Sequence, residues 1–155
     1  MKIDEEYQIL RHILDSVVTD SKCQYNPIYL CGPHDRTSLI VAEFRNNFIK
    51  AHPNLSVFHS GAEDLSDGIL EMTRFGIAVD PFKLFRETDL LIIERMELTG
   101  GRQLLMQYLF SAFDTVYENN KQILLTSEKL PNEIIGLEER NRAQYEGGII
   151  INLRG

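Results

Sequence analysis

The sequence has little of several features that point to particular classes of protein. Its 16 lysines and arginines are outnumbered by 23 acidic residues, which gives a formal net charge of −7. A surface of this sign repels a phosphate backbone unless its basic residues are gathered locally, so general nucleic-acid binding is disfavoured. No apolar run approaches the roughly 18 residues of a membrane span, and the N-terminal residues are acidic and polar. We therefore expect a cytoplasmic protein.

The chain is also poor in cysteine and has no internal repeat. Its two cysteines, Cys23 and Cys31, form no C-x-x-C pair and have no histidine pair at zinc-site spacing. We expect no metal site, and we expect Cys31 to be a small buried hydrophobe at the end of an apolar run. The length of 155 residues and the 43% of hydrophobic residues fit one globular domain, with a helix and linker over 1–24 and a core over 25–155.

Short apolar runs alternate with segments of helical period, which is typical of an α/β domain with a parallel sheet. The expected strands are residues 27–31, 55–60, 89–93, 121–126 and 148–153. Each is rich in Ile and Leu and apolar on both faces, as strands covered by helices on both sides should be. The sequence thus predicts a three-layer αβα fold around a five-stranded parallel sheet.

Helical patterns fill the segments between these strands. After the first strand, Ile40, Phe44 and Phe48 recur at helical spacing, which predicts a helix that follows Thr37 and ends near His52-Pro53. Residues 60–63 have the form of a capping box, and residues 80–81 offer an aspartate N-cap followed by proline at the first helical position. Two further helices are expected over residues 102–118 and 137–146, the second ending at a pair of glycines.

The turn after the first strand is where a P-loop protein binds phosphate, through G-x-x-x-x-G-K-[ST]. Here the turn reads GPHDRT over residues 32–37, which is two residues shorter than the motif and lacks its second glycine. Pro33 has no N–H to donate, and Asp35 places a negative charge where phosphate would sit. Arg36 and Thr37 can mimic the Lys-Thr pair, so weak ATP or ADP binding stays open. We favour an ordinary connection in which Asp35 or Thr37 caps the helix.

Five stretches carry a resemblance to a known family. They are NPIYLCG, IKAHPNLSVFHS, DLLIIERMEL, FSAFDTVYENNKQILLTSEKLPNEI and LEERNRAQYEGGIIINL. In this order they resemble the P-loop strand, the second helix–strand junction, the Walker B strand, the helix and sensor strand, and the arginine-finger box of DnaA/Hda-like AAA+ domains. The resemblance runs from about Tyr25 to the C-terminus. It implies a P-loop NTPase-like fold with the AAA+ strand order 5-1-4-3-2.

The resemblance also implies roles for particular residues. It outlines a vestigial nucleotide site at Gly32, Arg36, Thr37, Glu94 and Thr126. Glu94 falls at the Walker B carboxylate, but the neighbouring catalytic acid falls at Arg95, a cation that cannot take a proton from the attacking water. Thr126 falls at the polar sensor position, where a strand-end hydrogen-bonding role is equally open. We therefore expect a degenerate ATPase that is not an enzyme and holds no cofactor.

The residues that the family uses for subunit assembly and DNA binding are also partly replaced in this chain. The finger arginine falls at Gln144, although Arg140 and Arg142 keep the same helix basic, and these three residues form the expected interface. The family binds single-stranded DNA through two basic residues. Arg102 stands at the first of these positions, but Leu104 replaces the second, so we expect little affinity for single-stranded DNA. We also expect the chain to lack the adenine-enclosing N-terminal segment, the helical lid and the helix-turn-helix of the family, which makes duplex DNA binding unlikely.

These observations predict a non-catalytic interaction or regulatory module of DNA replication. Its expected partner is another AAA+ replication protein, such as DnaA or a helicase loader. Two alternatives stay open, namely a weak ATP/ADP switch and a single-stranded DNA binder. His34 and His59 both fall near strand ends and could approach each other, but we favour separate surface roles for them. Glu97 is expected to be a solvated loop residue.

Overall fold

A five-stranded sheet forms the centre of the computed structural model, which describes residues 2–20, 23–77 and 80–155. The strands are β1 (Ile28–Cys31), β2 (Val57–Gly61), β3 (Leu90–Glu94), β4 (Gln122–Ser127) and β5 (Ile149–Asn152). All neighbouring strands are parallel, in the order β2-β3-β4-β1-β5. Counted from the other edge this is 5-1-4-3-2, so the expected strands and their order are confirmed.

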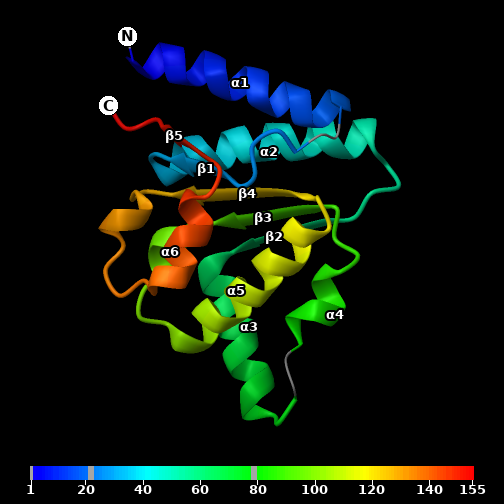
Figure 1. Ribbon diagram of the computed structural model, residues 1–155, viewed down its shortest axis with the longest axis vertical. Helices are drawn as coiled ribbons and strands as arrows, with labels where there is room; N and C mark the ends of the chain where they lie inside the picture. Colours follow the sequence, from blue (N-terminus) through cyan, green and yellow to red (C-terminus); the bar gives the residue numbers. More distant parts are fainter. Residues whose placement is uncertain (1, 21–22, 78–79) are drawn as a thin grey trace.

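Helices cover both faces of the sheet, giving three layers (Figure 1). On one face lie α1 (Lys2–Asp20) and α2 (His34–Ala51); on the other lie α3 (Ala62–Arg74), α4 (Pro81–Phe85), α5 (Gln103–Glu118) and α6 (Glu139–Glu146). Two short 3-10 turns, η1 (Met96–Leu98) and η2 (Pro131–Glu133), follow β3 and β4. None of the described helices is long and apolar enough to cross a lipid bilayer.

Alternating strand residues divide the interior into two cores. Ile28 and Leu30 of β1 point into the core beneath α1 and α2, whereas Tyr29 and Cys31 point into the core beneath α3, α5 and α6. The central strands β1 and β4 are buried throughout. The edge strand β2 is only half-buried, and so is the other edge strand, β5, except at Ile151; the expectation that every strand is covered on both faces is wrong at these edges. An edge strand has a neighbour on one side only, which leaves part of it open.

The predicted helix starts were correct in one case and wrong in another. Asp80 caps α4 as predicted, with its carboxylate accepting a hydrogen bond from the Phe82 N–H at 3.0 Å. The capping box predicted over residues 60–63 does not form, because β2 continues to Gly61 and the Ser60 hydroxyl donates to the Gly61 carbonyl instead. The helix predicted over 137–146 begins at Glu139.

A polar contact also ties the amino ends of the strands together. Asp89, just before β3, accepts a hydrogen bond from the Ser56 N–H at 2.8 Å and pairs with the Lys121 ammonium at 2.9 Å. Burial acts to raise the pKa of Asp89, but these two contacts outweigh it and hold the pKa below its ordinary value. The pair therefore stabilises the fold where the carboxyl is ionised.

Candidate functional site

The carboxyl ends of the parallel strands form the edge where an α/β protein of this kind binds its ligands. We call this the carboxyl edge, made of the turns after β1, β3 and β4 (residues 32–33, 95–102 and 128–138). In Figure 1 it lies on the left. It contains or adjoins most residues that the sequence singled out.

The turn after β1 is only two residues long, Gly32 and Pro33, before α2 begins at His34. The Gly32 N–H donates to the Ser127 carbonyl at 2.9 Å, and the Leu153 N–H donates to the Cys31 carbonyl at 2.7 Å. A Cβ on Gly32 would lie 3.2 Å from that of Leu153. Gly32 is therefore explained by close packing between β4 and β5, and its N–H is already used.

A carboxylate of the protein itself occupies the N-terminus of α2. The His34 N–H donates to Glu128 Oε2 at 2.9 Å, while the Arg36 and Thr37 N–H groups both donate to the Pro33 carbonyl at 3.0 Å. No side chain caps α2 from within the turn, so the expected cap by Asp35 or Thr37 is wrong. Glu128, from the end of β4, takes the place that a phosphate holds at such a helix start.

Several bonds fix the position of Glu128. Its own N–H donates to Glu97 Oε1 at 3.1 Å. The next residue, Lys129, donates its N–H to the Ser127 hydroxyl at 3.0 Å and accepts from the Tyr29 hydroxyl at 2.7 Å. Burial raises the pKa of Tyr29, so this hydroxyl remains a donor. The turn that carries Glu128 is thereby anchored to the core.

Glu97 is part of this arrangement. Its side chain is only 9% exposed, and its second oxygen accepts from Arg95 Nε at 3.3 Å. The expectation of a solvated loop residue is therefore wrong. Sequence reasoning missed both Glu97 and Glu128 as site residues; the available signal was an acid directly after the strand that neighbours β1.

The two residues expected to mimic a Lys-Thr pair do not face the turn together. Thr37 is 1% exposed, and its hydroxyl donates to the His34 carbonyl at 3.4 Å within α2. Arg36 points a guanidinium nitrogen at the Leu153 carbonyl at 3.5 Å. Both side chains are thus engaged in contacts within the protein, Thr37 with α2 and Arg36 with the residue after β5.

The turn after β3 holds the second group of expected site residues. Glu94 Oε2 lies 2.6 Å from His59 Nε2, and Glu94 Oε1 is buried without a hydrogen-bond partner among the described residues. Arg95 adopts a left-handed backbone conformation with φ of 65°, and its N–H donates to the Thr126 hydroxyl at 3.2 Å. Thr126 is thus occupied as a strand-end hydrogen-bond partner.

His34 and His59 do not approach each other. Their strands β1 and β2 are separated by β4 and β3, which corresponds to three strand spacings of about 4.8 Å each. Each histidine instead meets a glutamate, His34 through its N–H to Glu128 and His59 through its ring to Glu94. Among the described residues no group of three or more His, Cys, Asp or Glu side chains could hold a metal ion.

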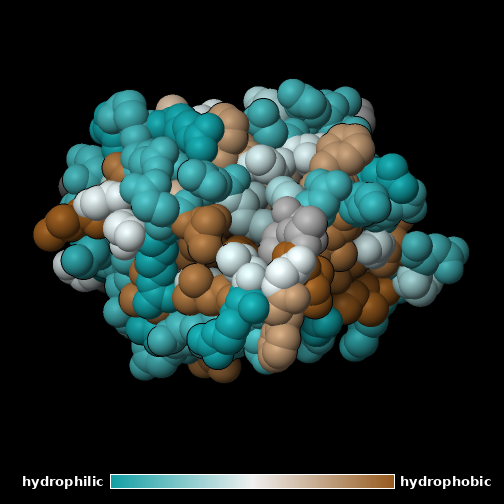
Figure 2. Space-filling model, turned by 90° about the horizontal axis from the view of Figure 1, so that it is seen from below, coloured by the Kyte–Doolittle hydropathy of each residue, from teal (hydrophilic) through white to brown (hydrophobic). Residues whose placement is uncertain are grey.

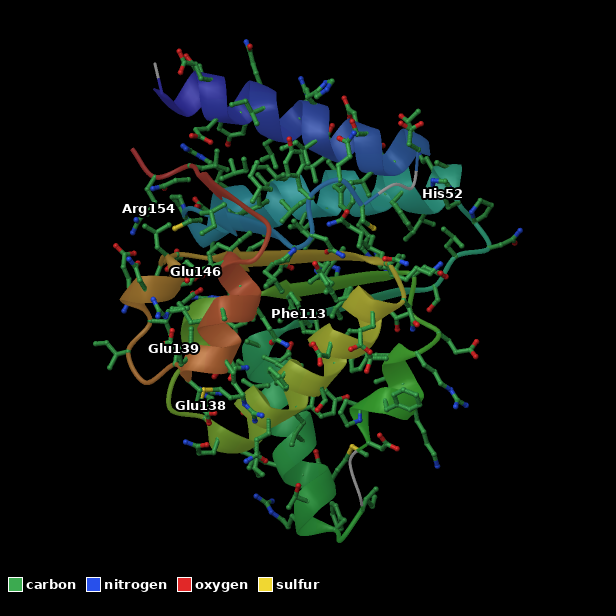
Figure 3. All side chains as sticks on the ribbon, viewed as in Figure 1. His52, Phe113, Glu138, Glu139, Glu146 and Arg154 are labelled. Atoms are coloured by element: carbon green, nitrogen blue, oxygen red, sulfur yellow. The ribbon has the colours of Figure 1, made fainter. Side chains whose placement is uncertain are left out.

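The helix expected to carry the arginine finger is folded down on α5. Gln144 donates from Nε2 to the Phe110 carbonyl at 3.0 Å, and the Arg140 guanidinium lies 4.3 Å from the centre of the Phe110 ring. Arg140 also pairs with Glu138, and Arg142 pairs with Glu139 and Glu146. Figure 3 shows Glu139 and Glu146 near the two ends of α6 and Glu138 just before it. The Gln144 amide therefore makes a hydrogen bond within the molecule, to the backbone of α5.

Arg102 stands at the start of α5 as its N-cap residue and is half-buried. Its backbone N–H donates to the Thr99 carbonyl at 3.2 Å, and its carbonyl accepts the first helical bond from Met106. Leu104, the second position of the expected single-strand contact, is exposed. The structure thus places one cation at this corner of the carboxyl edge.

Comparison with known proteins identifies the family. A sequence profile described as "Bacterial DnaA ATPAse domain" matches residues 5–152. The chain belongs to this DnaA ATPase-domain family. A chromosomal replication initiator protein DnaA from Geotalea daltonii is 30% identical over 145 residues, which cover 90% of this chain and 32% of the relative. The chain thus spans about a third of the length of that DnaA.

Solved structures agree with this assignment at the level of the fold. The AMPPCP-bound DnaA from Aquifex aeolicus has a TM-score of 0.85 at 23% identity, covering 96% of this chain and 46% of that one. The DnaC helicase loader has a TM-score of 0.68 at 14% identity, covering 95% and 89%. The expected DnaA-like AAA+ fold is confirmed.

Proposed function

We propose that this DnaA-like domain is a nucleotide-independent interaction module, which docks on another AAA+ protein in replication initiation or helicase loading. It binds its partner through the shape and the charges of its surface and does not hydrolyse ATP. The partner is an AAA+ domain that presents an arginine to its neighbour, as such domains do toward a bound nucleotide.

One observation carries the proposal, namely the hydrogen bond between the His34 N–H and the Glu128 carboxylate at 2.9 Å. A phosphate at the start of α2 would have to displace Glu128 or lie beside it. Two unit charges about 4 Å apart repel by about 4 kcal/mol at an effective dielectric of about 20. A micromolar ligand binds with only about 8 kcal/mol in total, so this repulsion, together with the missing amide of Pro33, removes most of the affinity.

The catalytic positions support the same conclusion. Arg95 stands where the family places the acid that activates water, and it lies beside Glu97 at 3.3 Å. Glu94, at the metal-side position, is paired with His59. With a cation in place of the general base and an amide in place of the finger, neither proton removal nor transition-state charge stabilisation is supplied.

The same edge offers a docking surface. Ile135 and Leu39, the two most exposed large hydrophobic residues in the described part of the chain, are 87% and 73% exposed. Ile135 lies in the turn after β4, and Leu39 in the second turn of α2. The exposed acids Asp35 and Glu128 supply negative charge near the start of α2, where the Glu128 carboxylate accepts the His34 N–H. A partner's finger arginine would meet a permanent negative charge there, flanked by apolar anchors.

Co-migration on a sizing column with the DnaA of the same organism tests the proposal. We expect a complex at tens of micromolar, formed equally well with and without ATP. The double substitution Leu39→Ser with Ile135→Ser should abolish it, whereas Ile9→Ser, on α1, serves as a matched exposed control and should not. Failure of the wild-type chain to co-migrate removes this partner, and a complex insensitive to the double substitution removes this surface.

A further inference from the structure

A second apolar surface lies away from the carboxyl edge, where α3 ends and α4 begins. We call it the α3–α4 tip, residues 70–77 and 80–84. Six of its large apolar side chains are between 39% and 71% exposed, namely Leu70, Met72, Phe75, Ile77, Phe82 and Leu84. Figure 1 shows the tip at the lower end of the molecule, and in the view from below apolar groups in brown interrupt the hydrophilic surface (Figure 2).

The amount of exposed apolar surface at the tip is at the upper end of what a monomer ordinarily leaves open. Counting roughly 200 Å² for each side chain of this size when fully exposed, the six expose about 600 Å². This equals the upper end of the largest patch on a typical monomer, about 300–600 Å². It is also most of the roughly 800 Å² that each partner contributes to a stable interface, and the surrounding polar residues can supply the remainder.

The charge pattern indicates what covers the tip. The whole chain carries a net charge of −7, so two copies that approach through most faces repel each other. Between residues 70 and 87, however, three basic residues (Arg74, Lys83 and Arg86) balance three acidic ones (Glu71, Asp80 and Glu87). This segment therefore combines a neutral balance of charge with a concentration of exposed apolar side chains, whereas the first half of α3, outside the tip, adds the exposed acids Glu63, Asp64 and Asp67.

The charges are also divided between the two helices in a self-complementary way. The exposed acids of α3 are Glu63, Asp64, Asp67 and Glu71, against a single base, Arg74. On α4 and its C-cap the exposed charges are Lys83 and Arg86, with the exposed acids Asp80 and Glu87 directly before and after this stretch. In a two-fold symmetric contact, residue i of one subunit meets residue j of the other and the reverse. Crossing α3 of one copy over α4 of the other brings opposite charges together twice.

From these observations we infer that the α3–α4 tip is the interface of a homodimer, with α3 of each copy packed against α4 of the other. Phe75 and Phe82 are its apolar anchors, and the acids of α3 meet Lys83 and Arg86 of the second copy. The carboxyl edge of each copy stays free. One dimer can therefore present two docking edges at once.

Sedimentation of this chain alone, at about 10–200 μM, tests the inference without any partner or nucleotide. We expect the wild type to dimerise in this range. Phe75→Ser with Phe82→Ser should raise the dissociation constant by about tenfold or more, because aromatic anchors dominate such contacts. Leu39→Ser is the matched control, and it should leave the dimer intact while a thermal melt verifies that each variant folds.

A charge swap distinguishes the proposed pairing from general stickiness. Lys83→Glu with Arg86→Glu should weaken the dimer, and adding Asp67→Lys with Glu71→Lys in the same chain should restore it. A wild-type chain that stays monomeric at 200 μM overturns the inference, and so does a dimer that survives the loss of both phenylalanines. Full dimerisation of the first charge variant, or no restoration in the second, rejects the crossing of α3 over α4.

Discussion

Replacing Glu128 by alanine removes the carboxylate that accepts the His34 N–H at the start of α2. Loss of a side-chain cap costs about 0.5–2 kcal/mol, and loss of a charge near a helix N-terminus costs about 0.3–1 kcal/mol. Glu128 is exposed, so solvent takes over part of its role and the lower half of these ranges applies. We expect Glu128→Ala to lower the free energy of unfolding by about 1 kcal/mol, and Glu128→Gln by about half as much, because the amide still accepts the bond.

Urea unfolding followed by circular dichroism measures this difference, and a thermal melt should fall by about 2–4 °C for the alanine variant. Lys129→Ala is the control, because it removes a neighbouring exposed charge while the backbone contacts of Lys129 remain. Glu128→Ala as stable as the wild type, within about 0.3 kcal/mol, would refute the idea that this carboxylate completes the helix start.

Three further predictions concern stability and reactivity. Because the pKa of Asp89 is lowered in the folded state, its contribution to stability is complete above about pH 4 and is lost as the pH falls through the folded pKa. In urea unfolding, Asp89→Asn should therefore be less stable than the wild type at pH 7, and the difference in free energy of unfolding should narrow toward pH 3. A difference that stays constant with pH would contradict this. Burial raises the pKa of Cys31 to about 11, so a thiol reagent at pH 8 should label Cys31 far more slowly than the partly exposed Cys23 until the chain is unfolded; equal native rates would contradict its burial. A Cβ on Gly148 would lie 2.0 Å from a backbone carbonyl oxygen, so Gly148→Ala should lower the free energy of unfolding in urea by about 1–3 kcal/mol. Gly68 lies in a helix with open space around it, so Gly68→Ala should raise the free energy of unfolding by about 0.5–1 kcal/mol. An unchanged stability of Gly148→Ala would show that the backbone moves freely there.

The fold was largely predictable because its signals are local. Each strand is a short apolar run, and α5, expected over residues 102–118, carries buried residues such as Leu105, Leu109 and Phe113 at helical spacing. The aspartate and proline at residues 80–81 likewise predicted the start of α4. These features depend on neighbouring residues only, so periodicity and capping chemistry suffice to find them.

The site was predictable only in part. Its shortened turn and its proline are visible in the sequence, but the group that completes it, Glu128, lies 94 residues away from His34. No local pattern joins two residues so far apart. Thr37 was expected to face the turn and is buried instead, because the short turn starts α2 early and directs Thr37 beneath Gly32.

The proposals give the molecule two separate contact regions. The carboxyl edge offers fixed carboxylates to an AAA+ partner, and the α3–α4 tip joins two copies. Since the two tests use different substitutions and only one of them involves a partner, either proposal can fail while the other stands.

Calorimetric titration with ATP and with ADP in the presence of Mg²⁺ tests the central claim most directly. The occupied start of α2 predicts no binding tighter than a dissociation constant of about 100 μM, which corresponds to about 5.5 kcal/mol. A saturable heat with a dissociation constant in the low micromolar range would contradict the claim that this domain works without nucleotide.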